Sequence, residues 1–422
     1  MKTGLAGCRV LVTDAHTTGS LAVVRSLAAA GVHVSVLAES GRFSLAASSR
    51  SVSRVVMLPP PDLQPALYLE GLVRELRNHS HDVLIPMTDS TIAIVQRERS
   101  SIEQAVRLAL APDCALLGAL DKKRTIDISS ANDVETPRTA VFSSLDALSS
   151  AASTLTYPCV VKPRYSRRWH ATGVMAKGNV EYAHSAESLR EIYDRSKLAP
   201  TDLLVQELVD GAGSGVFVLA DRGKPVAVFA HRRLREANPT GGRASLAVSI
   251  PPDDRLVSPA LRLLRALLWS GVAMVEFKDP GAPHAPVLME INARFWGSLP
   301  LAIAAGVDFP VLLARQVLGL PVEPPVTYNA GVRCRHLTGD LSYLTAAVKG
   351  RPQGWNGVFP GRIEALASIA PWPGRWRSFT FRLTDPAPAM GEAADFIRGT
   401  VNGLRRRALP GTPIKSVVKE QP

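Results

Sequence analysis

The feature that most constrains the fold is a predicted β-hairpin in the second half of the chain. Residues 272–278 and 287–292 are two short apolar runs with the alternating pattern of β-strands. The segment between them, residues 279–286, contains three prolines and a glycine and is typical of a turn. Symmetric pairing about this turn joins residues whose numbers sum to about 565, which to within one residue places Glu276 opposite Glu290, roughly 5 Å away. A register shift of one residue would move one side chain to the other face.

The polar residues of this hairpin suit a metal ion. Residues two apart in a strand share a face, so Glu290 and Asn292 point the same way, and Arg294 follows if the strand continues. Facing carboxylates repel unless a cation lies between them, and carboxylate and amide oxygens are ligands of Mg²⁺ that is shared with phosphates. A nearby arginine can stabilise charge that develops in phosphoryl transfer. An exposed hairpin with charges on its wet face fits the spacing equally well.

A second informative stretch is Tyr-Pro-Cys-Val-Val-Lys-Pro, residues 157–163, which predicts a strand. That strand delivers Lys162 into a turn that Pro163 makes stiff. Earlier in the chain, Asp121 precedes Lys122 at the expected start of a helix, where an aspartate is a good N-cap. A lysine at a helix start is common, so this pair alone is weak evidence.

Strands and helices alternate in the N-terminal region. Residues 9–13, 32–37 and 82–86 are short apolar runs, and residues 19–30 and 65–78 between them predict helices. This β-α-β order predicts a parallel sheet. The turn after the first strand lacks the pattern Gly-x-Gly-x-x-Gly, so a dinucleotide site is not expected.

The run Met-Glu-Ile-Asn-Ala-Arg-Phe-Trp-Gly-Ser, residues 289–298, resembles the Glu-x-Asn-x-Arg signature of the ATP-grasp superfamily. Members include biotin carboxylase, D-alanine–D-alanine ligase and the carbamoyl-phosphate synthase large subunit. The likeness extends over roughly residues 5–320 and is strongest to bacterial carboxylate–amine ligase-like proteins. It implies an α/β fold, with a Rossmann-like N-terminal domain, a two-lobed α+β ATP-grasp module that holds its nucleotide between two antiparallel sheets, and a small C-terminal extension.

The resemblance also assigns the metal site. It implies that Glu276, Glu290 and Asn292 hold Mg²⁺, with Mn²⁺ as an alternative, and that Arg294 stabilises the transferring phosphoryl group. Proteins of this superfamily use ATP, so ATP and Mg²⁺ are the expected cofactors.

The nucleotide site follows from the same resemblance. Lys162 matches the catalytic lysine on the α and β phosphates, where a lysine acts as a point charge, and Lys122 matches a second phosphate-binding lysine. The adenine is expected against main-chain groups near Glu207 and Leu208, with Gln206 meeting its amino group.

The chain departs from the family pattern at two places. Family members often carry a glycine-rich loop whose backbone amides cover the phosphates. Residues 164–170 read Arg-Tyr-Ser-Arg-Arg-Trp-His instead, so either arginine side chains or a lid that orders on binding are expected to replace it. A ribose-binding glutamate commonly lies seven residues after position 206, where this chain has Gly213, so the ribose contacts must differ.

The N-terminal unit resembles the domain that precedes the ATP-grasp module, and residues 91–110 are expected to close it as a helix. Ligands of such sheets bind beyond the carboxyl ends of strands, so Asp14, His16 and Asp89 are candidates for contact with the acceptor substrate. Roles as caps and turn formers are the simpler interpretation. The arginine-rich residues 231–243 suit a carboxylate substrate, or equally a solvated strand end.

Five parts are expected in all. They are a Rossmann-like pre-ATP-grasp domain (1–112), a first ATP-grasp lobe (113–200), a second lobe with the metal site (201–320), a C-terminal extension (321–404) and a disordered tail (405–422). The sequence assigns no role to the extension.

Composition limits the partners and the location. The chain has 422 residues and a formal charge of +12, which is compatible with nucleic acid, an anionic membrane or an anionic substrate. The motifs favour an anionic substrate, so we expect small-molecule carboxylate and amine substrates, no nucleic acid and no membrane. A homodimer is compatible with the sequence. Four scattered cysteines without metal or redox spacing indicate reduced thiols, and no signal peptide or long apolar run is seen, so a cytoplasmic location is expected.

The expected activity is that of an ATP-dependent, ADP-forming carboxylate–amine ligase. A carboxylate would attack the γ-phosphate to give an acyl phosphate, and an amine would displace the phosphate to form an amide. The protein would supply position and charge, as phosphoryl transfer requires. A carboxyphosphate- or carbamoyl-phosphate-forming enzyme and a non-catalytic ATP-binding protein are the alternatives.

Overall fold

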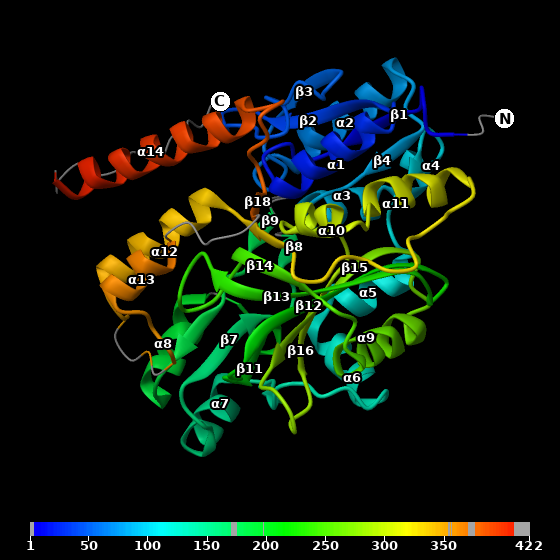
Figure 1. The fold of residues 1–422 in the computed structure, drawn as a ribbon. Helices are drawn as coiled ribbons and strands as arrows, with labels where there is room; N and C mark the ends of the chain where they lie inside the picture. Colours follow the sequence, from blue (N-terminus) through cyan, green and yellow to red (C-terminus); the bar gives the residue numbers. More distant parts are fainter. Residues whose placement is uncertain are drawn as a thin grey trace, which may run out of the picture.

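The computed structural model describes residues 4–169, 175–196, 198–352, 355, 357–369 and 376–408. Figure 1 shows an N-terminal α/β unit packed on a larger unit built around two sheets. Helix α14 projects from this body, beside the pair formed by α12 and α13.

The N-terminal unit contains the predicted parallel sheet, in the order β3-β2-β1-β4-β5. Its strands are β1 (Arg9–Val12), β2 (His33–Glu39), β3 (Arg54–Leu58), β4 (Val83–Ile85) and β5 (Arg107–Leu108), and its helices are α1 (Thr18–Ala29), α2 (Pro65–Asn78), α3 (Asp89–Arg97) and α4 (Arg99–Glu103). The expectation of one helix over residues 91–110 is wrong. The chain breaks at Glu98, and β5 instead pairs with β4, so that Val106 and Ala109 are buried.

The first lobe is a four-stranded antiparallel sheet in the order β10-β7-β11-β6. Its strands are β6 (Thr139–Ala140), β7 (Cys159–Pro163), β10 (Glu181–Ala183) and β11 (Leu203–Glu207). Between β7 and β10 the chain forms a separate two-stranded hairpin of β8 (Arg167–Trp169) and β9 (Met175–Lys177). Helices α5 (Asp113–Leu120) and α6 (Lys122–Ser130) precede this sheet, and α7 (Leu145–Ala151), η1 (Ala152–Thr154), α8 (Ala186–Ser196) and η2 (Pro200–Asp202) lie between its strands. Because β11 pairs with β7, residues 203–207 belong to this sheet, although they fall within the range expected for the second lobe.

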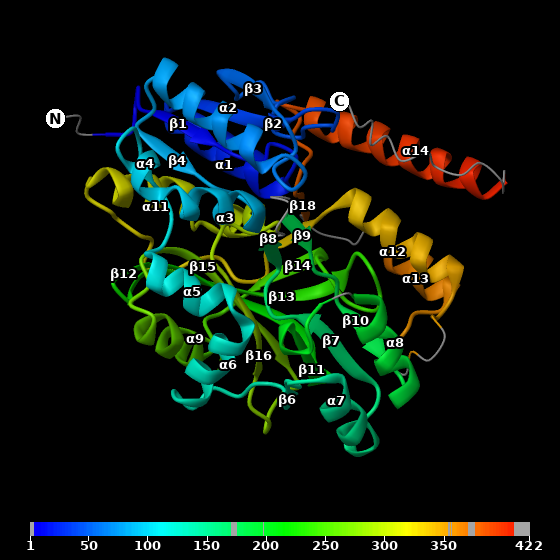
Figure 2. The same ribbon diagram turned by 180° about the vertical axis from the view of Figure 1, so that it is seen from behind.

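The second lobe is a seven-stranded sheet in the order β16-β15-β12-β13-β14-β17-β18. Its strands are β12 (Ala212–Asp221), β13 (Lys224–Glu236), β14 (Ala244–Ile250), β15 (Gly271–Asp279), β16 (Val287–Asn292), β17 (Arg333–Arg335) and β18 (Trp376–Ser378). Helix α9 (Asp254–Ala266) lies with α5 and α6 along one face, as Figure 2 shows.

The C-terminal region is joined to this sheet. Its strands β17 and β18 extend the sheet, and its helices are α12 (Leu337–Lys349), α13 (Arg362–Ile369) and α14 (Ala387–Ala408). Asp340 in α12 is fully buried and binds both Arg235 of β13 and Arg335 of β17. Helix α14 includes residues 405–408, where we expected a disordered tail, and residues 409–422 lie outside the described residues.

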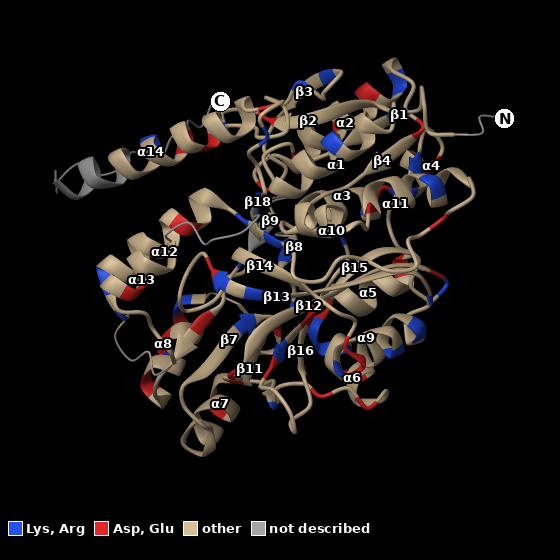
Figure 3. Ribbon diagram, in the orientation of Figure 1, with Lys and Arg blue, Asp and Glu red and all other residues tan. Residues whose placement is uncertain are grey.

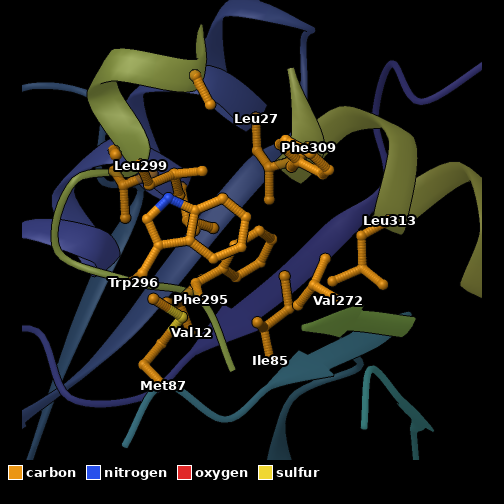
Figure 4. Packing of buried hydrophobic residues seen from close by; sticks show 14 of the residues in the cluster. Val12, Leu27, Ile85, Met87, Val272, Phe295, Trp296, Leu299, Phe309 and Leu313 are labelled. Carbon is orange, nitrogen blue, oxygen red and sulfur yellow. The ribbon is translucent and has the colours of Figure 1, made fainter. Parts of the chain in front are cut away.

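The segment after the hairpin joins the second lobe to the N-terminal unit. Phe295 and Trp296 are buried against Met87 and the side chains of α10 (Leu299–Ala305) and α11 (Phe309–Leu318), as Figure 4 shows. Helix α1 approaches so closely that a Cβ atom at Gly19 would lie 3.1 Å from the carbonyl oxygen of Trp296. The two units therefore share one core around the signature segment.

Among the residues with a described structure, no single helix has the length and hydrophobicity to cross a membrane. The broken pair α10 and α11, bent by 93°, meets those criteria on length and composition alone.

We expect Trp296→Ala to lower the free energy of unfolding by about 3 to 5 kcal/mol, because it leaves a cavity in the shared core. Urea unfolding followed by circular dichroism would measure the change. Phe381→Ala is the control, since Phe381 is 47% exposed and its loss should change stability little. Equal effects of the two substitutions would contradict the shared core.

Candidate active site

The predicted facing of the two hairpin carboxylates is confirmed. Glu276 of β15 pairs directly with Glu290 of β16, and a bulge follows between Glu276 and Phe277. The Nδ2 group of Asn292 donates to Glu290 Oε1 over 2.8 Å. The amide oxygen of Asn292 takes no part in this bond, and with the two carboxylates it would be available to a metal ion.

Arg233 of β13 contacts this pair. One of its terminal nitrogens lies 2.6 Å from Glu276 Oε2, and another lies 3.3 Å from Glu236 Oε1. Burial raises the pKa of Glu276, the Arg233 guanidinium works against that rise, and Glu290 adds to it. Arg233 therefore offsets part of the cost of placing two partly buried carboxylates opposite each other.

The side chains around position 213 explain why this position holds a glycine. A Cβ atom there would lie 3.0 Å from both Arg233 Cδ and Glu236 Oε1. The Arg233–Glu236 pair therefore occupies the space that a larger residue at 213 would need.

The two candidate lysines lie in one cleft with Glu290 and Gln206. Its wall is formed by Ala119, Lys122, Thr125, Ile126, Thr136, Pro137, Lys162, Gln206, Leu288, Met289 and Glu290. Burial lowers the pKa of Lys162 to about 8, the charge of Glu290 opposes this, and Lys122 adds to it. The Lys122 ammonium donates to Ser166 Oγ over 3.0 Å. The cleft thus has a cationic end and an apolar wall, which suits a nucleotide.

Gln206 and Glu207 differ in their relation to the cleft. Gln206 is buried in its wall, and its Nε2 donates to Thr139 Oγ1 over 2.8 Å. The Glu207 carboxylate accepts from Arg138 N and Nε, and the Glu207 N–H donates to the Arg138 carbonyl. Glu207 and Leu208 follow the cleft wall without belonging to it, so the structure does not bring them together with the lysines.

Arg294 points toward the N-terminal unit. Its Nε lies 2.8 Å from Asp89 Oδ1, and its Nη1 donates to the carbonyl oxygen of Phe295 over 3.2 Å. Burial acts to lower the pKa of Arg294, but Asp89 and then Glu290 raise it overall. The guanidinium is therefore held charged between the β15–β16 hairpin and α3.

The arginines of residues 164–169 are already paired with acids. Arg164 binds Asp121 through two nitrogens, at 2.8 and 2.7 Å, and Arg167 and Arg168 bind Asp62 and Asp202. They therefore do not lie as free donors over the cleft, and His170 lies outside the described residues. Figure 3 shows basic and acidic residues side by side around β13, β16 and α6.

Asp14 and His16 are two of the candidate residues at strand ends. Asp14 has a φ of 55° and accepts hydrogen bonds from Thr88 and Thr91, which matches the turn interpretation. Burial lowers the pKa of His16 to about 4, with Arg42 adding to the shift, so its ring is neutral near pH 7.

One buried group was missed by the sequence reasoning. His231 lies in the same row of the sheet as the carboxylates, because Gly215 pairs with Glu276 on one side and His231 on the other. Burial lowers its pKa to about 3, and its Nε2 has no partner among the residues that the structure describes. Strand alternation would have found it, since His231 and Arg233 share a face.

Comparison with known proteins agrees with this geometry. A family model described as "ATP-grasp in the biosynthetic pathway with Ter operon" matches residues 199–340. The carbamoyl phosphate synthase large chain of Methanospirillum hungatei is 23% identical over 308 residues, which cover 68% of this chain and 28% of that protein. The chain thus spans less than a third of the length of this curated relative.

Three solved structures share the fold. Biotin carboxylase from Campylobacter jejuni has a TM-score of 0.61 at 12% identity, covering 77% of this chain and 74% of that one. The biotin carboxylase domain of 2-oxoglutarate carboxylase from Hydrogenobacter thermophilus, solved with MgADP and bicarbonate, gives 0.60 at 14% identity and 79% and 74% coverage. An L-amino acid ligase from Bacillus licheniformis gives 0.57 at 16% identity and 75% coverage of each chain.

Residues 199–340 thus resemble an ATP-grasp family, and the three solved structures share the fold of this chain. The expected α/β architecture, with a parallel N-terminal sheet followed by a mixed-sheet module, is confirmed. The roles of individual residues stay predictions.

We expect the affinity for Mg²⁺-ATP to be constant below about pH 7 and to fall above pH 8, by up to about tenfold per pH unit. The reason is that Lys162 loses its proton as the pH rises through its pKa of about 8, while the phosphates bind its charged form. Calorimetric titrations from pH 6.5 to about 9.5 would measure this. Lys162→Arg stays charged, so its affinity should not fall in this range. A flat wild-type profile would remove Lys162 from the phosphate site.

Proposed function

We propose that the protein is an ATP-dependent ligase that activates a carboxylate as an acyl phosphate and joins it to an amine. The observation that carries this proposal is the facing pair Glu276 and Glu290, of which Glu290 lines a cleft together with Lys162. Small-molecule substrates and a cytoplasmic location belong to the same proposal, and a homodimer is compatible with it.

The donor set fits a divalent cation that is shared with phosphates. Within the described part of the chain, no three His, Cys, Asp or Glu side chains are grouped for a metal. Mg²⁺ bound with nucleotide does not need such a group, because phosphate oxygens and waters supply most of its ligands. Glu276, Glu290 and the oxygen of Asn292 would supply the protein's share, with Mn²⁺ as an alternative metal. When bound, the ion would neutralise charge on the β and γ phosphates.

The remaining residues would then bind and orient. Lys162 and Lys122 would hold the phosphates, and Gln206 would meet the adenine at the apolar wall. Among the described residues the Leu208 N–H has no hydrogen-bond partner, whereas that of Glu207 is occupied, so Leu208 is the better main-chain donor to the base. Arg294 would stabilise the phosphoryl group as it passes to the acceptor carboxylate.

A second candidate uses the same site with bicarbonate as the acceptor. It is favoured by the relation to a carbamoyl phosphate synthase and by the bicarbonate in one similar structure. Such an enzyme would release ADP with bicarbonate and no added organic acid.

We expect Glu290→Gln to slow ADP release about a hundredfold or more, because phosphates that lose one charged metal ligand are misaligned. Stability should stay equal or rise slightly, since one of two repelling carboxylates is neutralised. ADP release and melting temperature would be measured together. Glu323→Gln, at an exposed glutamate outside the cleft, is the matched control and should leave both unchanged.

Turnover of Glu290→Gln at the wild-type rate would disprove the metal site, and unfolding of this variant would make Glu290 structural. Hydroxylamine distinguishes the two candidate reactions. An acyl phosphate should yield a hydroxamate across a panel of acids when the amine is left out. ADP release without hydroxamate from any acid would favour the bicarbonate reaction.

A further inference from the structure

Beyond the hairpin itself, the start of α3 holds the signature arginine from another unit of the protein. We propose that Asp89 is a positioning residue for Arg294, so that the N-terminal unit takes part in the phosphoryl-transfer step. The inference rests on the proposed function for its kinetic consequence. The geometry of the contact stands independently of that function.

The Asp89 side chain is not needed to cap its own helix. Thr88 is the N-cap of α3, and it forms a reciprocal capping box with Thr91. Asp89 is the first helical residue, where the helix dipole favours a carboxylate, and its Oδ1 accepts from Arg294 Nε over 2.8 Å. Asp89 and Arg294 are 205 residues apart in the sequence. The contact therefore joins two units, and it is made by a side chain that does not cap its own helix.

The contact fixes the orientation of the guanidinium. Asp89 holds Arg294 Nε, and the carbonyl oxygen of Phe295 holds Nη1. Among the described residues no partner is assigned to Nη2, which leaves that donor for a phosphoryl oxygen. A planar guanidinium held at two nitrogens can move little in its own plane, so its remaining donor has one direction.

The next residue of α3, Ser90, also contacts an arginine, in this case one from the first lobe. Ser90 Oγ lies 2.6 Å from Arg167 Nε and 2.5 Å from Asp62 Oδ1. Arg167 belongs to the β8–β9 hairpin, which directly follows the strand of Lys162. Two consecutive residues at the start of α3 thus hold one arginine from each ATP-grasp lobe.

The charges around Asp89 agree with this arrangement. Burial acts to raise the pKa of Asp89, but Arg294 lowers it overall, with Arg167 and Lys122 contributing. The Asp89 carboxylate neutralises part of the positive charge that would otherwise attract phosphates. Phosphate binding therefore does not account for this residue, whereas the positioning of Arg294 does.

The variant Asp89→Asn and the control Asp113→Asn test the proposal. Asp113, the first residue of α5, forms a similar ion pair with Arg99 of the N-terminal unit, 2.9 Å from its Nε and outside the cleft. Arginine labelling with phenylglyoxal, mapped by mass spectrometry, reports the freedom of each guanidinium. We expect Arg294 to be labelled severalfold faster in Asp89→Asn than in wild type, and at the wild-type rate in Asp113→Asn.

Kinetics then separates positioning from mere folding. We expect the rate of ADP release at saturating Mg²⁺-ATP to fall about a hundredfold in Asp89→Asn, the size of effect expected when a group is misplaced by about 1 Å. Calorimetric ATP affinity should be unchanged, and Asp89→Glu should recover part of the rate. If Asp89→Asn fails to fold, the Asp89→Glu protein carries the test, with smaller changes in the same directions.

Unchanged Arg294 labelling in Asp89→Asn would overturn the proposal, and so would a parallel loss of ATP affinity and rate. A wild type that releases no ADP under any condition would refute the proposed function instead. The labelling result would still decide whether Asp89 holds Arg294.

Discussion

The repulsion between two facing carboxylates is the constraint on which the site depends. Glu276 and Glu290 are directly paired on adjacent strands, and the low dielectric of the interior strengthens their interaction. The protein offsets this with Arg233 on Glu276 and with the amide of Asn292 on Glu290. Of these residues Glu290 lines the cleft with Lys162, and in the proposed function a further cation bound with phosphates would complete the charge balance.

The positive groups around this pair come from all parts of the fold. Lys162 belongs to β7 of the first lobe, Lys122 to α6, and Arg294 follows β16 and is held by Asp89 of the N-terminal unit. Burial lowers the pKa of Lys162 to about 8, so this lysine loses its proton at a lower pH than an exposed lysine does. The site is thus an assembly in which the relative placement of three units sets the charge distribution.

Local signals predicted much of this, and long-range pairing explains what they missed. The proline-rich turn predicted the hairpin and its register to within one residue, and alternation put Glu290 and Asn292 on one face. The bulge between Glu276 and Phe277 then sets the pairing of Glu276 with Glu290. The partner of β11 and the ion pairs of Arg164 to Arg168 depend on segments far away in the chain, so no local pattern predicts them. The single helix expected over residues 91–110 failed because β4 offered a strand partner. The likeness to ATP-grasp proteins followed from the motif, whereas the substrates do not follow from the fold.

The most direct test of the central claim is a crystal structure with Mn²⁺ and a non-hydrolysable ATP analogue. Anomalous scattering locates Mn²⁺ independently of the atomic coordinates. The account predicts a peak within coordination distance of Glu276, Glu290 and the phosphates, with the Lys162 ammonium on the phosphate chain. A nucleotide bound elsewhere, or a metal bound without contact to either glutamate, would contradict it.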